Sequence, residues 1–121
     1  MKKFIFVTAL LGSSVYAAEI ELNNVVFRSG EFGIEPIIEL SISNNTQNEV
    51  VAFKAGLTCL DAFGDVAFTL NITDRSANIP PRARVTGAWK PNMFSDAGKI
   101  VLSNDAKNFS CSFEDIQVVL K

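Results

Sequence analysis

A strict alternation of apolar and polar residues is the feature that most limits what this chain can fold into. It is cleanest over residues 66–73, where Val66, Phe68, Leu70 and Ile72 alternate with small or polar side chains. Alternate residues of a β-strand point to opposite faces, so the pattern places one face on a core and the other in water. No stretch repeats its apolar residues with the period of a helix, and we therefore expect an all-β fold.

Six further segments have the composition of strands, which makes seven in all. They are residues 20–28, 36–43, 49–61, 84–90, 99–103 and 109–120. The tight sequence at 61–65 predicts a hairpin between the strands on either side of it. Seven strands joined by short polar turns predict a two-layer antiparallel β-sandwich of the immunoglobulin-like type, with a small β-barrel as the alternative.

The apolar phase slips by one residue inside the last of these segments. Two sets of apolar residues carry its pattern, Phe109, Cys111 and Phe113 and then Ile116, Val118 and Leu120. One extra residue near Glu114-Asp115 restores the phase, so we predict a β-bulge there. Gly56, inside the strand predicted at 49–61, marks either a bulge or a close approach of two backbones.

The first seventeen residues have the pattern of a secretory signal peptide. Two lysines precede an apolar run of about eight residues, and small residues at Val15 and Ala17 predict cleavage after Ala17. The run is much shorter than the roughly 20 residues that span a bilayer. We expect one sandwich domain at 18–121, without a transmembrane segment, in the periplasm or secreted. The Met-Lys-Lys start is typical of bacteria, most simply of a Gram-negative species.

Cys59 and Cys111 are the only cysteines, and both follow the predicted leader. An even pair of cysteines in a small exported domain predicts a disulfide. The alternation turns both toward an apolar face, so we expect the two sulfurs to meet across the core. Two cysteines without a CxxC spacing and without histidine make a poor zinc site. We therefore expect a structural bond and neither a metal nor a cofactor.

The charged residues and the absence of histidine exclude several classes of function. Removal of residues 1–17 leaves nine basic and thirteen acidic residues, which is a net charge of −4. The chain contains no block of basic residues, so we do not expect it to bind nucleic acid. The chain has no histidine, which excludes Ser-His and Cys-His nucleophile pairs. Asp61, Asp65 and Asp74 lie near turns and are expected to cap them rather than to bind calcium or form an acid–base pair. We expect a protein without enzymatic activity.

Part of the chain has a recognisable succession of turns. A strand ending in Ser43-Asn44-Asn45 precedes a strand that runs into residues 60–65, and a Pro-led strand follows at 79–89. This succession resembles the small secreted immunoglobulin-like domains of the FxLYD type and, more loosely, the LEA-type sandwich. The chain differs at Cys59-Leu60-Asp61, where the family has Leu-Tyr-Asp, and at Pro81-Arg82, where Pro-Gly is usual. The resemblance implies the fold and an extracytoplasmic location, and it transfers no catalytic residue.

Three large side chains around Pro91 are candidates for contact with a ligand or partner. Trp89, Met93 and Phe94 lie close together in the chain. An exposed aromatic cluster stacks on a sugar ring or anchors a protein partner. The alternative is that Trp89 belongs to the core and Phe94 closes the end of the sandwich.

A second candidate is a group of cations. Arg82, Arg84 and Lys90 are two and six residues apart. On a strand this spacing places all three on one face, either as an anion-binding patch or as an ordinary solvated surface.

Together these features predict a non-catalytic binding or structural module of the bacterial periplasm or envelope. Its expected partner is another envelope or secreted protein, held by loops or by an open sheet edge. A carbohydrate- or envelope-polymer-binding domain that uses Trp89 and Phe94 is the alternative, and a small hydrolase or inhibitor is the third possibility.

The disulfide is directly testable. Thiol quantification on the purified, unfolded protein should find no free thiol, because Cys59 and Cys111 are expected to be bonded to each other. Two free thiols per chain would contradict this.

Overall fold

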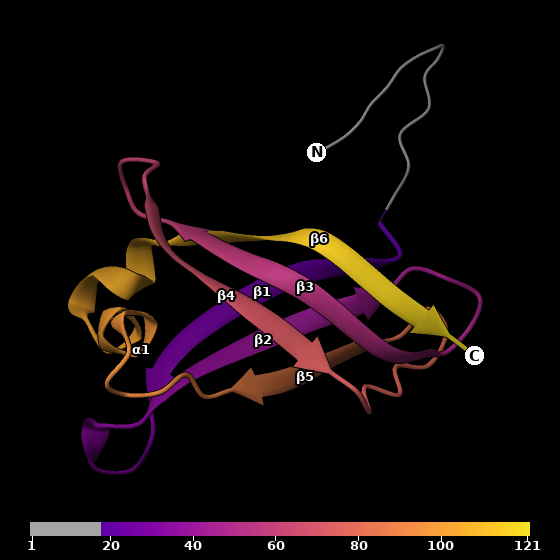
Figure 1. Ribbon diagram of the computed structural model, residues 1–121, viewed down its shortest axis with the longest axis horizontal. Helices are drawn as coiled ribbons and strands as arrows, with labels where there is room; N and C mark the ends of the chain where they lie inside the picture. Colours follow the sequence, from indigo (N-terminus) through magenta and orange to yellow (C-terminus); the bar gives the residue numbers. More distant parts are fainter. Residues whose placement is uncertain (1–17) are drawn as a thin grey trace.

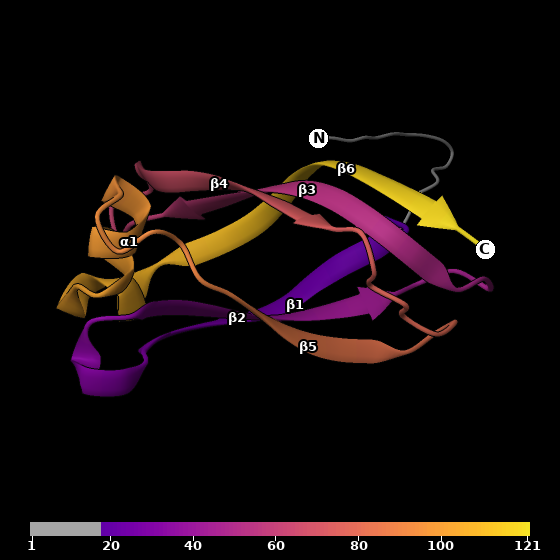
Figure 2. The same cartoon turned by 60° about the horizontal axis from the view of Figure 1, so that its bottom comes forward.

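The computed structural model describes residues 18–121, except the side chains of Asn104 and Asp105; the predicted leader at 1–17 lies outside the described residues. One sheet has the order β1 (Ile20–Ser29), β2 (Pro36–Asn44) and β5 (Arg84–Trp89). The other has the order β4 (Val66–Asp74), β3 (Val50–Leu60) and β6 (Ser110–Leu120). All four strand pairs are antiparallel. Figures 1 and 2 show the two sheets lying face to face.

This architecture confirms the predicted all-β, two-layer antiparallel sandwich and the hairpin between β3 and β4. The strand orders correspond to the A-B-E and C′-C-F strands of an immunoglobulin sandwich. The described residues contain six strands rather than the seven expected.

The missing seventh strand is a helix. Residues 99–103 were expected to be extended, but α1 (Asp96–Val101) occupies most of this segment, followed by the 3-10 helix η2 (Asn104–Asn108). The Ser95 side chain accepts a hydrogen bond from the Gly98 amide and so caps the first turn, and Asp96 follows at the positive end of the helix dipole. A short apolar run fits a strand or a buried helix equally well, so the capping serine was the decisive signal.

The core lies between the central strands of the two sheets. Ile38, Leu40 and Ile42 of β2 face Phe53, Leu57 and Cys59 of β3, and every one of these side chains is at most 3% exposed. Alternation of inward and outward residues along both strands produces this layer. The edge strands β1, β4, β5 and β6 add apolar side chains that are partly buried against it.

The Cys59–Cys111 disulfide is confirmed, but its place differs from the expectation. The two residues are register partners on β3 and β6 of one sheet, with 4.0 Å between their Cα atoms. The bond therefore ties two neighbouring strands instead of joining the layers across the core. Alternation specifies the face to which a cysteine points but does not determine which strand lies beside it. The prediction of a bond across the core was wrong for this reason.

The predicted bulge in the last strand is confirmed. The β3–β6 register shifts between Lys54 and Gly56, opposite Gln117 and Glu114, and Asp115 has a φ of 52°. Gly56 faces the bulge, and a Cβ atom there would lie 3.5 Å from the Glu114 carbonyl oxygen. The bulge restores the inward direction of the apolar residues that follow it.

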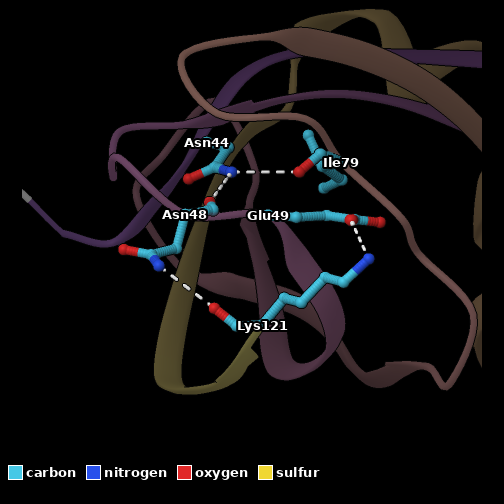
Figure 3. A network of polar contacts seen from close by, with 5 residues as sticks. All are labelled: Asn44, Asn48, Glu49, Ile79 and Lys121. Atoms are coloured by element: carbon cyan, nitrogen blue, oxygen red, sulfur yellow. Dashed lines mark hydrogen bonds and ion pairs between the residues drawn. The ribbon is translucent and has the colours of Figure 1, made fainter.

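A buried asparagine joins the β2–β3 turn to the loop before β5. Asn44 is 1% exposed, and its Nδ2 donates to the carbonyl oxygens of Asn48, Ile79 and Pro80 at 2.8, 3.0 and 3.1 Å. Its Oδ1 accepts from the amide and the hydroxyl of Thr46. Figure 3 shows this amide group between the two segments. The three carbonyl oxygens also accept from Thr46 Oγ1, the Val50 amide and the Ala83 amide, so Asn44 adds a second donor to each of them and its own buried amide group is satisfied.

The carboxyl end of the chain is held beside this network. Asn48 Nδ2 donates to the Lys121 carbonyl oxygen at 3.0 Å, and Lys121 Nζ lies 3.7 Å from Glu49 Oε1 (Figure 3). The Lys121 amide also donates to the Glu49 carbonyl oxygen. These contacts fix the end of β6 to the start of β3.

We expect Asn44→Ala to lower the free energy of unfolding by about 2 to 4 kcal/mol, because it removes all the hydrogen bonds that this buried side chain makes with two segments of the chain. The neighbouring Asn45 is the matched control, since its amide donates only in exposed surroundings. Asn45→Ala should cost less than about 1 kcal/mol. Urea unfolding of both variants measures the difference, and equal losses would contradict the role given to Asn44.

Candidate functional site

The two ends of the sandwich differ in character. At the end where α1 lies, three connections gather: residues 30–35 between β1 and β2, residues 61–65 between β3 and β4, and residues 90–109 between β5 and β6. Figure 1 shows all three on the left, opposite the carboxyl terminus. We call these three connections the loop end.

Each connection of the loop end exposes one phenylalanine. Phe32, Phe63 and Phe94 are 92%, 91% and 77% exposed. Ile34 and Met93 are exposed in the same connections. Single exposed apolar residues are ordinary on a protein surface, so these side chains are candidates for contact only because their three connections all lie at one end of the sandwich.

Local hydrogen bonds hold two of these aromatic tips. Asp61 Oδ1 accepts from the amides of Phe63 and Asp65 at 2.9 and 3.0 Å, which confirms the turn-capping role predicted for this aspartate. The Phe94 amide donates to Asn92 Oδ1 at 2.8 Å in the turn before α1. Backbones held in this way lose little further freedom when a partner binds.

The third tip has an unusual backbone. Phe32 lies in the short 3-10 helix η1 (Glu31–Gly33) with a φ of 60°, and the Gly30 amide closes the loop on the Glu35 carbonyl oxygen at 2.7 Å. A bulky side chain in the left-handed region is strained, and such strain occurs most often where function requires it. Here it presents the ring to solvent.

A hollow of about 410 Å³ separates the η1 loop from the chain that follows β5. Ile34, Pro36, Pro91 and Met93 give it apolar walls, and the carboxyl and ammonium groups of Glu35 and Lys90 lie 3.5 Å apart at its rim. Met93 and Lys90, two residues singled out from the sequence, therefore share one groove.

A larger hollow of about 490 Å³ lies between the β3–β4 turn and the helical segment. Phe63, Ala67, Ile100 and Phe109 line it together with Lys99. A volume of this size suits a side chain or a small ligand. Sequence reasoning did not identify this hollow. The available signal was Phe63, a large apolar residue at the tip of a turn otherwise made of Asp, Ala and Gly.

Trp89 ends β5 next to the loop end but, unlike the exposed tips, faces the core. It is the register partner of the fully buried Ile38, so both face the core, and its ring centroid is 6.4 Å from that of Phe53. A Cβ atom on Gly87 would lie only 2.9 Å from the Trp89 ring, so the glycine leaves the space that the ring covers. Of the three residues predicted to cluster around Pro91, Met93 and Phe94 are the two that are exposed at the loop end.

The three cations do not form one patch. Arg84 begins β5, whereas Lys90 follows its last residue at the opposite end and pairs with Glu35. Arg82 precedes the strand with a φ of 61°, and its Nη1 donates to the Asn45 carbonyl oxygen at 2.9 Å. Each cation therefore serves a separate local contact or faces solvent.

Within residues 18–121, no group of three or more His, Cys, Asp or Glu side chains is placed to hold a metal ion. None of the helices in that range has the length and apolar composition to cross a membrane. Comparison with protein-family models found no match, and comparisons with curated proteins and with solved structures found none either. Function is therefore inferred from the geometry of the chain itself.

Alanine substitution separates the two aromatic positions. Trp89→Ala should lower the free energy of unfolding by about 3 kcal/mol, because it removes a ring packed on Phe53 and Gly87. Phe94→Ala should change it by less than about 0.5 kcal/mol, because this ring is mostly in solvent. Urea denaturation measures both, and a Trp89→Ala variant as stable as the parent would contradict the core position.

Proposed function

We propose that this protein is an exported, non-catalytic binding module of the periplasm or envelope, and that its loop end contacts another envelope or secreted protein. The observation that carries this proposal is the exposure of Phe32, Phe63 and Phe94 on three separate connections at one end of the sandwich. Aromatic side chains dominate the energetics of protein interfaces, and burial of each ring would contribute about 1.5 to 3 kcal/mol.

The surroundings of the three tips suggest the charge of the partner. Glu31, Asp65 and Asp96 are exposed close in sequence to Phe32, Phe63 and Phe94, respectively, and the exposed lysines Lys90, Lys99 and Lys107 lie on the same loop end. Apolar anchors bordered by both signs of charge favour a partner surface with apolar pockets and a mixed-charge rim.

Export is supported by two independent features. The amino-terminal sequence has the three parts of a secretory leader. The Cys59–Cys111 bond is of the kind that persists in oxidising compartments such as the periplasm.

The alternative, a carbohydrate- or envelope-polymer-binding domain, depends on Trp89 and Phe94. Trp89 faces the core, so Phe94 is the one ring of this pair that stands free for stacking on a sugar. A protein partner would contact three exposed rings, whereas a sugar would stack on Phe94 alone, so we favour a protein partner.

The proposal is tested by a photo-crosslinking amino acid placed at Phe63 or Phe94 in cells that produce the protein. We expect both positions to capture the same single protein in stoichiometric amounts. Val119, 56% exposed on β6 near the opposite end, is the control position. It should not capture that protein.

A variant with Phe32→Ser, Phe63→Ser and Phe94→Ser should keep the parent's unfolding free energy within about 1 kcal/mol and lose the captured partner. Retention of the partner by this variant, or capture from Val119 alone, would overturn the loop end as the contact surface. Binding of this protein to a purified glycan, lost with Phe94→Ser, would favour the alternative.

A further inference from the structure

The four edge strands differ in how well they are protected from pairing with another chain. β6 carries a bulge with exposed Glu114 and Asp115, and the register of β1 shifts between Leu22 and Asn24. β5 has only six residues, begins with Arg84 and is followed directly by Lys90. Bulges, charges and short length are the usual devices that keep sheet edges from associating.

β4 lacks these devices over most of its length. Its residues 66–73 contain no charge, no proline and no glycine. The register between β4 and β3 shifts once, at Ala67, and from Phe68 to Asp74 the two strands pair without a shift. Because β4 is the outermost strand of its sheet, the backbone groups on its far side have no neighbouring strand within the described chain.

The side chains along this edge suit pairing with an identical strand. Thr69, Asn71 and Thr73 are exposed on the outer face, whereas Phe68 and Ile72 are buried and Leu70 is partly buried on the inner face. In an antiparallel pair centred on Asn71, each Thr69 lies opposite Thr73 of the second copy, and Leu70 lies opposite Ile72. Threonine pairs and apolar pairs directly across two strands are both stabilising.

The charges at the two ends of β4 favour the same arrangement. Asp65 precedes the strand and Arg75 follows it, and both are exposed. The three ion pairs found among residues 18–121 involve neither residue. With Asn71 on the axis, Arg75 of each copy lies opposite Ala67 of the other, two residues from Asp65, and Asp74 lies opposite Phe68. Antiparallel pairing therefore brings each Arg75 toward an Asp65, whereas parallel pairing would place Arg75 beside Arg75 and Asp65 beside Asp65.

From these features we propose that a second copy of this chain binds the outer edge of β4, antiparallel and centred on Asn71, so that a six-stranded sheet runs through a two-fold symmetric dimer. Such an interface uses the same strand on both copies and closes on itself. β4 runs away from the loop end, so the two loop ends of the dimer point in opposite directions. The proposal does not depend on the partner proposed above.

Sedimentation equilibrium of the purified, oxidised protein tests the proposal. One pair of short strands buries little surface, so we expect a concentration-dependent dimer with a Kd of about 100 µM. Asn71→Lys places two like charges on the symmetry axis and should weaken the dimer at least about tenfold. Gln117→Lys, a lysine on the exposed face of β6, is the matched control and should leave the dimer unchanged.

Charge reversal tests the direction of pairing. Arg75→Glu should weaken the dimer, and Arg75→Glu combined with Asp65→Arg should restore it. A protein that stays monomeric up to about 1 mM would overturn the proposal. A dimer insensitive to Asn71→Lys, or one weakened by Gln117→Lys, would also overturn it, because another surface would then hold the copies together.

Discussion

The structure depends on the pairing of β3 with a strand on each side. β3 is antiparallel to β4 along one edge and to β6 along the other, and its inward side chains Phe53, Leu57 and Cys59 lie in the core. The Cys59–Cys111 bond lies near the loop end and fixes β6 to β3 just before the turn that carries Phe63. The Phe63 turn therefore stands beside the disulfide, whereas Phe32 and Phe94 lie on connections that leave β1 and β5 of the other sheet.

The two ends of the sandwich satisfy opposite physical requirements. At the end beside the carboxyl terminus, Asn44 is fully enclosed and bonded to three carbonyl groups, so polar groups are buried and paired. At the loop end, Phe32, Phe63 and Phe94 are in water, although burial would be favourable for each of them. A chain that closes one end with hydrogen bonds and leaves aromatic rings exposed at the other has a stable framework with a surface suited to a partner.

Several features could be predicted from residues alone because they depend on local periodicity. The alternation at 66–73 placed β4, and the one-residue slip near Asp115 located the bulge. The neighbour of a strand could not be predicted, because alternation does not specify it, and so Cys111 was expected across the core rather than beside Cys59. Phe63 was missed because the sequence of its turn predicts a bend without specifying which side chain faces solvent. Trp89 could not be placed without knowing that Ile38 lies beside it.

The central claim is that rigid strands hold three exposed aromatic tips. Native-state hydrogen exchange of the isolated, oxidised protein tests it most directly, because exchange reports the free energy of local opening at each amide. The account predicts that the amides of Leu57 and Thr58 in β3 exchange only on global unfolding, whereas those of the residues around Phe32 and Phe94 exchange by small local openings. Protection around Phe32 and Phe94 as strong as that of Leu57 would contradict it, because those tips would then be packed inside the fold.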